Sequence, residues 1–195
     1  MALKLFGGGT ITGLNAGGLP DASVTSADLA AGAVTASNIG TKTFVSYAII
    51  CDLKSDGVDG GSSVLDTWTT RDLNTTIADP DSIVSISSNQ FTLQSGTYFI
   101  KWYAPAQATS QHKARLYNFT DSTVVQNGQN AHTTSTNNSA SIAFGVGRTT
   151  IGSSKTFEIQ HIVNTSNAGD GFMQAGNATG DNEEMYTIVE IFKEA

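Results

Sequence analysis

Three histidines are the first residues to examine for catalytic or metal chemistry, since imidazole acts as a base or a metal ligand near neutral pH. His112, His132 and His161 stand outside any HExxH or CxxC pattern, so the sequence gives little support for a zinc site. His161 falls on the apolar face of the segment FEIQHIV. We interpret it as a hydrogen-bonded core residue, with metal ligation as the alternative, whereas His112 fits either role.

Other catalytic patterns are missing from the sequence. Cys51 is the single cysteine and lies within the apolar segment FVSYAIIC, which favours a buried, inert thiol. No G-x-S-x-G is present, and GGGTITG lacks the spacing of a dinucleotide fingerprint. Glu183 and Glu184 are adjacent, so in a strand they point to opposite faces and make a poor acid and base pair. We therefore expect a protein that is not an enzyme and needs no cofactor.

Two polar clusters allow a binding role. Asp52, Asp56 and Asp59 lie close together among glycines in CDLKSDGVDGG, but their spacing does not match a calcium-binding EF-hand loop, and we expect no metal. Trp68 and Arg71 in WTTRDLN could stack on a ligand. The simpler interpretation is that Trp68 plugs one end of the fold and that Arg71 pairs with a carboxylate.

The composition excludes several classes of partner. The chain has 195 residues, a formal net charge of -7, 14% charged residues and 20 glycines. An acidic surface is unsuited to nucleic-acid phosphates. The segment MALKLFGGGTITG lacks the apolar core of a signal peptide, and no apolar run approaches a membrane span.

Residues 1–41 differ from the rest of the chain and predict an attachment or stalk segment. VTSADL at 24–29 and VTASNI at 34–39 repeat with a period of ten, and LNAGGL keeps the same apolar register. So thin an apolar strip cannot offset the entropy of ordering the backbone, at about 1 to 2 kcal/mol per residue. We therefore expect it to pack against other copies or a docking partner, with a flexible tail as the alternative. The predicted stalk-packing residues are Leu14, Leu19, Val24, Leu29, Val34 and Ile39.

Residues 42–195 predict a head domain made of strands. Apolar segments with alternating patterns follow one another, with turn signals between them, which is typical of a β-sandwich. The expected strands are 43–53, 82–87, 90–94, 97–104, 113–119, 123–126, 140–147, 156–163 and 185–192. In the segment 140–147 we expect Ile142, Phe144 and Val146 to face inward.

Two of these segments, TYFIKWYA and MYTIVEIF, are apolar on both faces. A sandwich buries one face of each strand, so an apolar outer face indicates a surface covered by assembly with other subunits. The candidate interface residues are Tyr98, Ile100, Trp102, Tyr103, Tyr186, Ile188 and Phe192.

Receptor contact, if it occurs, is expected in two polar segments, 126–139 and 164–182. Their amides and hydroxyls suit hydrogen bonding to sugars, and two apolar side chains in the second could anchor a ligand. The candidate receptor-binding residues are Asn130, His132, Asn137, Asn167, Phe172 and Met173.

The head also resembles a known family. WTTRDLNT, DPDSIVSISSNQFTLQSGTYFIKWYAPA, HKARLYNFTDSTVVQNG and the terminal YTIVEIFKEA occur in the order seen in the C-terminal domain of bacteriophage tail fibres and virion spikes. That domain is similar to the C1q and tumour-necrosis-factor jelly rolls. The resemblance implies an all-β jelly-roll sandwich, a homotrimer, and a stalk that contacts other virion proteins.

The resemblance thus implies a virion protein on the surface of the phage particle, assembled in the bacterial cytoplasm, that recognises host polysaccharide or protein. A capsid head-fibre or decoration protein anchored by residues 1–41 is the alternative. A secreted C1q-like binding module is a third, more remote interpretation.

Overall fold

The computed structural model describes residues 43–135, 139–176 and 183–195. The predicted stalk residues lie outside the described residues. The described residues form eleven strands and no helix, and thus no helix long and apolar enough to cross a membrane. The strands are β1 (Phe44–Ser55), β2 (Thr69–Thr70), β3 (Thr75–Ala78), β4 (Val84–Ser87), β5 (Gln90–Leu93), β6 (Gly96–Gln107), β7 (Gln111–Asn118), β8 (Thr123–His132), β9 (Ala140–Ile151), β10 (Lys155–Val163) and β11 (Glu183–Glu194).

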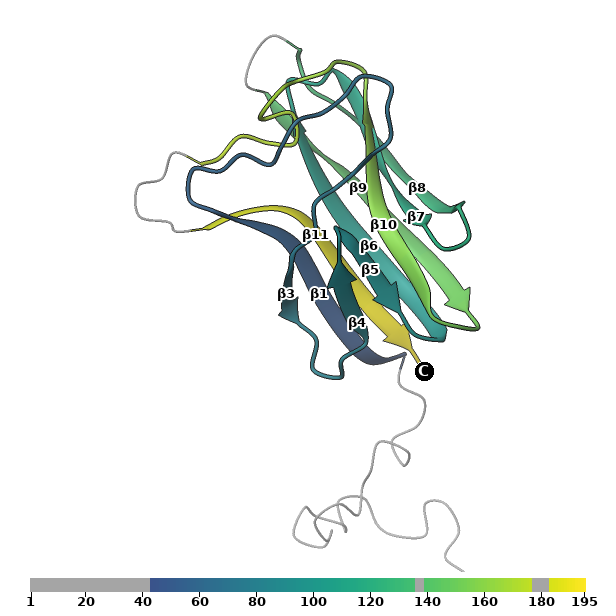
Figure 1. Cartoon of the computed structure of the whole chain (residues 1–195). Helices are drawn as coiled ribbons and strands as arrows, with labels where there is room; N and C mark the ends of the chain where they lie inside the picture. The colour runs from purple at the N-terminus through teal and green to yellow at the C-terminus, as the bar shows by residue number, and fades with distance from the viewer. Residues whose placement is uncertain (1–42, 136–138, 177–182) are drawn as a thin grey trace, which may run out of the picture. The chain divides into compact units, whose positions relative to one another are not determined.

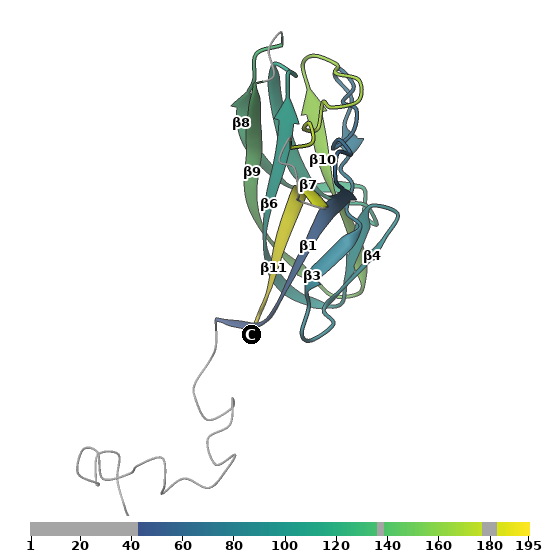
Figure 2. The ribbon, with the colours of Figure 1, turned by 90° about the vertical axis from the view of Figure 1, so that its left-hand side faces the viewer.

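The strands form two antiparallel sheets that pack face to face (Figures 1 and 2). The first sheet has the order β3-β1-β11-β6-β9, and the second has the order β4-β5-β10-β7-β8, with β2 added to β10. Neighbouring strands in each sheet are mostly distant in the sequence, as in a jelly roll, where consecutive strands alternate between sheets. The predicted fold class, an all-β jelly-roll sandwich, is confirmed.

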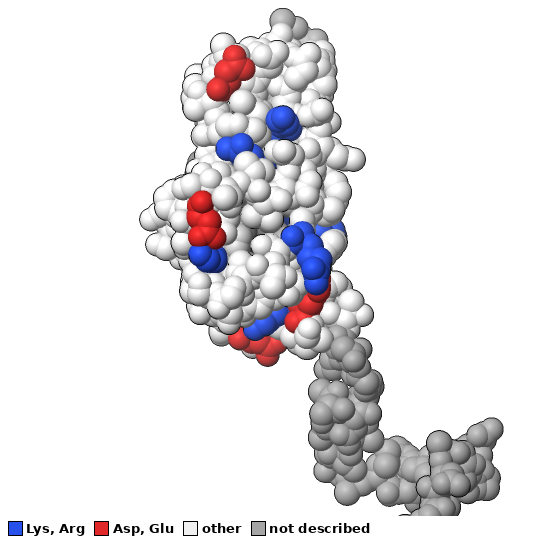
Figure 3. Space-filling model, turned by 90° about the vertical axis from the view of Figure 1, so that its right-hand side faces the viewer, with Lys and Arg blue, Asp and Glu red and all other residues white. Residues whose placement is uncertain are grey.

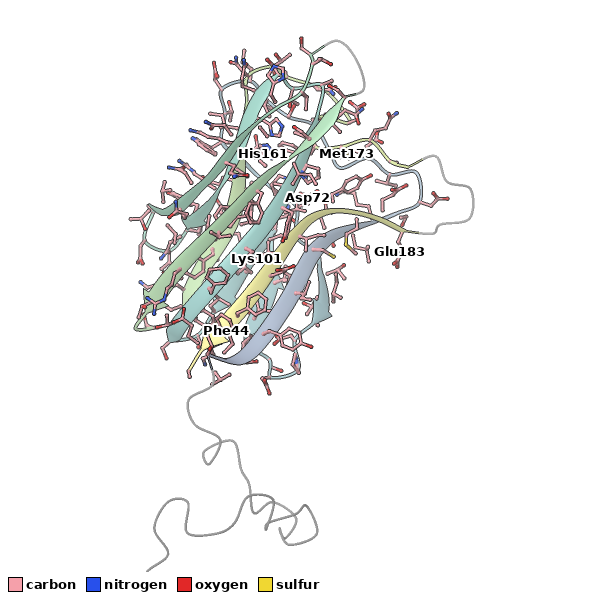
Figure 4. The ribbon with its side chains drawn as sticks, turned by 180° about the vertical axis from the view of Figure 1, so that it is seen from behind. Phe44, Asp72, Lys101, His161, Met173 and Glu183 are labelled. Atoms are coloured by element: carbon pink, nitrogen blue, oxygen red, sulfur yellow. The ribbon has the colours of Figure 1, made fainter. Side chains whose placement is uncertain are left out.

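The strand registers define two ends of the sandwich. Phe44 at the start of β1 pairs with Glu194 at the end of β11, and we call this end the base. The end of β10 pairs with the start of β7, Val163 opposite His112, and we call this opposite end the apex. Figure 4 shows Phe44 at the base and His161 near the apex.

Small residues of β9 and a large residue of β6 explain how the two sheets fit together. Trp102 is fully buried, and a Cβ atom added to Gly145 would lie only 2.0 Å from its indole atom Cζ2. Ala143 and the glycines of β9 therefore face the core, because no larger side chain fits beside this indole.

The predicted inward orientation of Ile142, Phe144 and Val146 is therefore wrong. Ile142 is 57% exposed and Val146 is 41% exposed, because the space on the core side is taken by Trp102. The alternating pattern was correct, but the larger residues of this strand point outward. They add apolar area to the outer side of the first sheet.

Two further parts of the strand prediction need correction. Residues 126–132 were expected in a polar loop, but they continue β8 as far as His132. They pair with β7, which leaves their polar side chains on the surface. The short strands β2 and β3 were missed because sheet edges of two and four residues show no alternation.

Candidate functional site

The outer side of the first sheet, called the outer face below, carries apolar side chains from four neighbouring strands. Strand pairing aligns them in two rows across the sheet, one with Tyr47, Phe192 and Phe99 and the other with Ile188, Tyr103 and Phe144. The Phe99 and Phe192 ring centroids are 6.4 Å apart, and those of Tyr103 and Phe144 are 5.2 Å apart. Aromatic rows of this kind are typical of interface cores rather than of free surface.

The charges in the middle of the outer face neutralise each other. Lys101 Nζ lies 2.6 Å from Glu190 Oε2, between the two rows. Figure 4 labels Lys101 partway along this sheet, between Phe44 and the apex. At the base, Arg148 pairs with Glu194 at 2.7 Å. The outer face therefore offers apolar area without a net charge that would select a strongly charged partner.

A hollow of about 630 Å³ lies at the apical end of the outer face. Its wall includes Tyr103, Pro105, Ile142, Met173 and Met185, which are predominantly apolar. Met173 has a φ angle of 103°, an unusual conformation for a residue with a side chain. Met173 thus combines this unusual backbone conformation with a place in the wall of the hollow.

The predicted interface residues separate into three groups. Tyr98, Ile100 and Trp102 are fully buried in the core between the sheets, so their assignment to an outer interface is wrong. The cause is the two-residue period of β6, which directs these three inward and Phe99, Lys101 and Tyr103 outward.

On β11, Ile188 and Phe192 are on the outer face in line with the prediction of two apolar sides. Tyr186 shares their side of the strand but is only 5% exposed, and its hydroxyl donates to the Val58 carbonyl at 2.7 Å. The chain around Val58 covers Tyr186. Tyr186 therefore contributes to the wall of the hollow but not to the outer face.

A buried polar cluster fills the apex beneath the loop of residues 164–176. Arg71 is fully buried, and its guanidinium stacks on the Phe172 ring with 4.0 Å from Cζ to the ring centroid. It donates to Thr187 Oγ1 at 2.8 Å and to the backbone carbonyls of Pro105 and Phe172 at 3.0 and 3.3 Å. The expected carboxylate partner of Arg71 is thus replaced by neutral oxygens.

The two apical histidines extend this cluster toward β9. His161 stacks on the Phe172 ring, with 5.3 Å between the two ring centroids. His161 Nε2 lies 2.9 Å from His112 Nδ1, and His112 Nε2 lies 2.8 Å from Ser141 Oγ. The prediction that His161 is a hydrogen-bonded core residue is confirmed, and His112 takes the same role.

This chain of hydrogen bonds excludes protonation of both imidazoles at once. One proton between the two rings satisfies both facing nitrogens, whereas the other ring nitrogen of His161, Nδ1, has no partner among the described residues. Burial lowers the pKa of His112 to about 4, with Arg71 and His132 adding to the effect. Burial and the neighbouring charge of Arg71 likewise hold the pKa of His161 well below its ordinary value.

The predicted receptor-binding residues occupy different environments. Asn130 and His132 are exposed on β8, and Asn137 lies outside the described residues. Asn167 has a structural role, because its Nδ2 donates to the Gln107 carbonyl at 3.1 Å. Phe172 is 4% exposed and packs against Arg71 and His161, so its predicted role as a surface anchor is wrong.

The other candidate ligand groups do not converge on one another. Among the described residues, no three His, Cys, Asp or Glu side chains are grouped to hold a metal ion, which leaves Asp52, Asp56 and Asp59 without a shared site. Asp52 is fully buried 3.2 Å from Lys54, and burial raises the pKa of its carboxyl group although Lys54 opposes the shift. Trp68 is covered by Arg115, whose Cζ lies 3.8 Å from the ring centroid.

Strand order and outer face together define the head as a jelly-roll sandwich with one apolar side. No family model and no curated protein matches the sequence. Among solved structures, the chain is similar to the globular domain of zebrafish complement 1qA, with 14% identity and a TM-score of 0.47 over 76% of this chain and 96% of that one. It is also similar to murine APRIL, with 8% identity and a TM-score of 0.48 over 76% and 98% of the two chains. For the PRD1 vertex protein P5 the values are 10% identity, a TM-score of 0.49, and 79% and 100% coverage. At such identities the likeness concerns the fold alone.

Proposed function

We propose that the protein is a non-enzymatic, homotrimeric virion fibre or spike protein whose head contacts the host surface. The outer face carries this proposal, because its aromatic rows and internal Lys101–Glu190 pair are suited to burial against other copies of the same face. The number three and the place on the phage particle rest on the resemblance of the head sequence to bacteriophage fibre domains.

The arrangement of the head agrees with such a role. The chain enters the described head at the base, where β1 begins beside the end of β11. The apex is the end of the head farthest from this first strand residue, and we propose that it contacts the receptor. Three copies at the tip of one fibre would raise the avidity of individually weak contacts by about 10² to 10⁴.

Charged substitutions on the outer face are expected to dissociate the oligomer. Ile142→Lys with Val146→Lys changes two side chains that are 57% and 41% exposed in the protomer, so the sandwich itself has room for both changes. In an assembled interface, six lysines would be buried about one axis at a prohibitive cost in desolvation. Light scattering should give the trimer mass for the unmodified protein and the monomer mass for the variant.

A matched control is available on the second sheet. Phe119 and Val124 are 52% and 42% exposed near the turn between β7 and β8, and replacing both by Lys should leave the trimer mass unchanged. A second control is the head alone, beginning at Lys42, which should remain trimeric. A monomeric unmodified protein, or a trimeric outer-face variant, would contradict the proposed assembly.

Binding experiments separate the two virion roles. Labelled full-length protein would be mixed with bacterial cells and, separately, with purified capsid shells. Binding to cells supports host recognition by a fibre or spike. Binding to shells without binding to cells would instead favour the capsid head-fibre or decoration protein.

A further inference from the structure

A pocket of about 320 Å³ opens at the apex between the ends of β7, β8 and β10. It lies where Asn130 pairs with Lys113 and where Val163 pairs with His112, on the second sheet and thus away from the outer face. Its volume is at the lower end of the range for small-molecule sites. The pocket suits one small polar unit rather than a long chain.

Polar groups that form no hydrogen bond in the fold converge on this pocket from three parts of the chain. Asp66, Gln111, Lys113 and Asn130 all line it. Within the part of the chain that the structure describes, the Asp66 carboxylate, the Gln111 amide nitrogen, the Lys113 ammonium and the Asn130 amide form no hydrogen bond with the protein. Lys113 Nζ also lies 5.9 Å from the centroid of the Trp68 ring. Polar groups placed together without hydrogen-bond partners in the fold are able to bind a ligand.

The fold holds these groups in position. Asp66 has a φ angle of 53°, and its backbone N–H donates to the Val163 carbonyl at 3.0 Å. The Gln111 side-chain oxygen accepts from Asn164 Nδ2 at 2.9 Å, which leaves the nitrogen of the Gln111 amide as the free end. A left-handed residue tied to a neighbouring strand is a local strain of the kind found at binding sites.

The hydrogen-bond donors and acceptors in the pocket wall indicate the kind of ligand that it can bind. The Asp66 carboxylate only accepts hydrogen bonds, Lys113 and the Gln111 nitrogen only donate them, and the Asn130 amide does both. A sugar hydroxyl also donates and accepts, so adjacent hydroxyl groups match this mixture. The side chain of Ile162 supplies an apolar patch for the C–H groups of a sugar ring.

The charges in the pocket wall further restrict the class of ligand that the pocket can bind. One carboxylate and one ammonium balance each other in the wall, and on the side of the head that carries β7 and β8 the acidic and basic residues are interspersed (Figure 3). A strongly anionic ligand would face Asp66 in a chain with a net charge of -7. A cationic ligand would face Lys113.

We propose that this apical pocket binds a neutral saccharide unit. This inference rests on the proposed function, because saccharide binding would be the means of host recognition. The location of the site and the class of its ligand are derived from the pocket residues alone. Asp66 and Asn130 act as the hydroxyl-binding residues, and Ile162 forms the floor. Asn130 was among the predicted receptor-binding residues, whereas Asp66, Gln111 and Lys113 were not.

The test uses the full-length protein on a glycan array that carries neutral, sialylated and cationic amino-sugar glycans. We expect binding to glycans that end in a neutral sugar such as glucose, galactose or N-acetylglucosamine. Asp66→Asn keeps the shape and tolerates the left-handed backbone, but it removes the charged acceptor, and Asn130→Ala removes both the donor and the acceptor of that amide. Each should weaken binding by at least about tenfold, as expected for a lost hydrogen bond to a hydroxyl group.

Asn127→Ala provides the matched control, because Asn127 is an exposed asparagine of the same strand outside the pocket wall. It should bind as the unmodified protein does, and all variants should keep the same oligomer mass and melting temperature. Binding to none of the glycans, binding to charged glycans alone, or unchanged binding by both pocket variants would overturn the inference.

The cell-binding experiment distinguishes this inference from the proposed function. If the unmodified protein and both pocket variants bind cells equally, host recognition stands and the pocket inference fails. If the protein binds neutral glycans through the pocket but neither cells nor capsid shells, the pocket stands and the proposed function fails.

Discussion

Gly145→Ala is expected to lower the free energy of unfolding of the head by at least about 3 kcal/mol, the upper part of the range for overpacked cores. The added Cβ atom would lie 2.0 Å from Trp102 Cζ2 and 2.3 Å from Cε2. Trp102 is fully buried and cannot rotate into free space. Urea unfolding at a fixed protomer concentration would measure the change, because the stability of an oligomer depends on concentration.

Two further variants make this prediction specific. Gly152→Ala adds a methyl group with no atom within 4 Å, so it should change the stability by no more than about 0.5 kcal/mol. Trp102→Phe combined with Gly145→Ala should be more stable than the sum of the two single changes predicts, since the smaller ring leaves room for the methyl group. Equal stability of Gly145→Ala and the unmodified protein would show that the two sheets are not packed as described.

Acidification is expected to destabilise the apex, with a loss of about 3 kcal/mol from His112 alone between pH 6.5 and 4. The pKa of His112 is lowered from 6.5 to about 4 by burial. Above pH 6.5 the imidazole is neutral in both the folded and the unfolded chain, and it contributes nothing to the pH dependence. As the pH falls, the unfolded chain binds a proton that the folded head does not, so stability decreases until about pH 4.

Other titratable groups also change the stability of the head as the pH falls. Burial lowers the pKa of His161 in the same sense, which steepens the loss. The raised pKa of Asp52 acts in the opposite sense, because the folded head binds that proton at a higher pH than the unfolded chain does. Arg71 faces both rings as a positive charge throughout this range.

Urea unfolding at several pH values between 7 and 4 would test this expectation. His112→Gln should flatten the pH dependence by about 3 kcal/mol, because it removes the titrating group while keeping a side chain able to form hydrogen bonds. His132→Gln, on an exposed position of β8, provides the comparison and should change the pH dependence far less, because burial is the largest cause of the lowered pKa of His112 and His132 contributes less. The prediction fails if the His112 variant and the unmodified protein lose stability in parallel.

The fold class could be predicted from the sequence because each long strand carries its own signal. Alternating apolar residues placed β10 correctly, with Phe157, Ile159, His161 and Val163 all directed into the core. The direction of β9 could not be found in the same way. Whether Ile142 or Ala143 faces inward depends on the bulk of Trp102 on the neighbouring strand, which no local pattern contains.

The candidate site was predictable only in outline. Two-sided apolar strands indicated a covered outer face, but the pattern of β6 alone did not say which of Tyr98 and Phe99 belongs to it. The burial of Arg71 was also missed, because its partners are a hydroxyl group and backbone carbonyls contributed by β6, β11 and the apical loop. The apical pocket depends on four separate segments, which only the folded chain brings together.

The pairing of Phe44 with Glu194 has a consequence for how such a head can diversify. The first and last strands are fixed to each other at the base, so their register constrains the sequence there. Residues 164–176 at the apex belong to no strand, and insertions in this loop that keep Asn167 and Phe172 in place would not shift any ladder of the two sheets. The same scaffold can therefore accept new sequence in the exposed parts of this loop while the register at the base stays constant, which suits the host recognition that we propose.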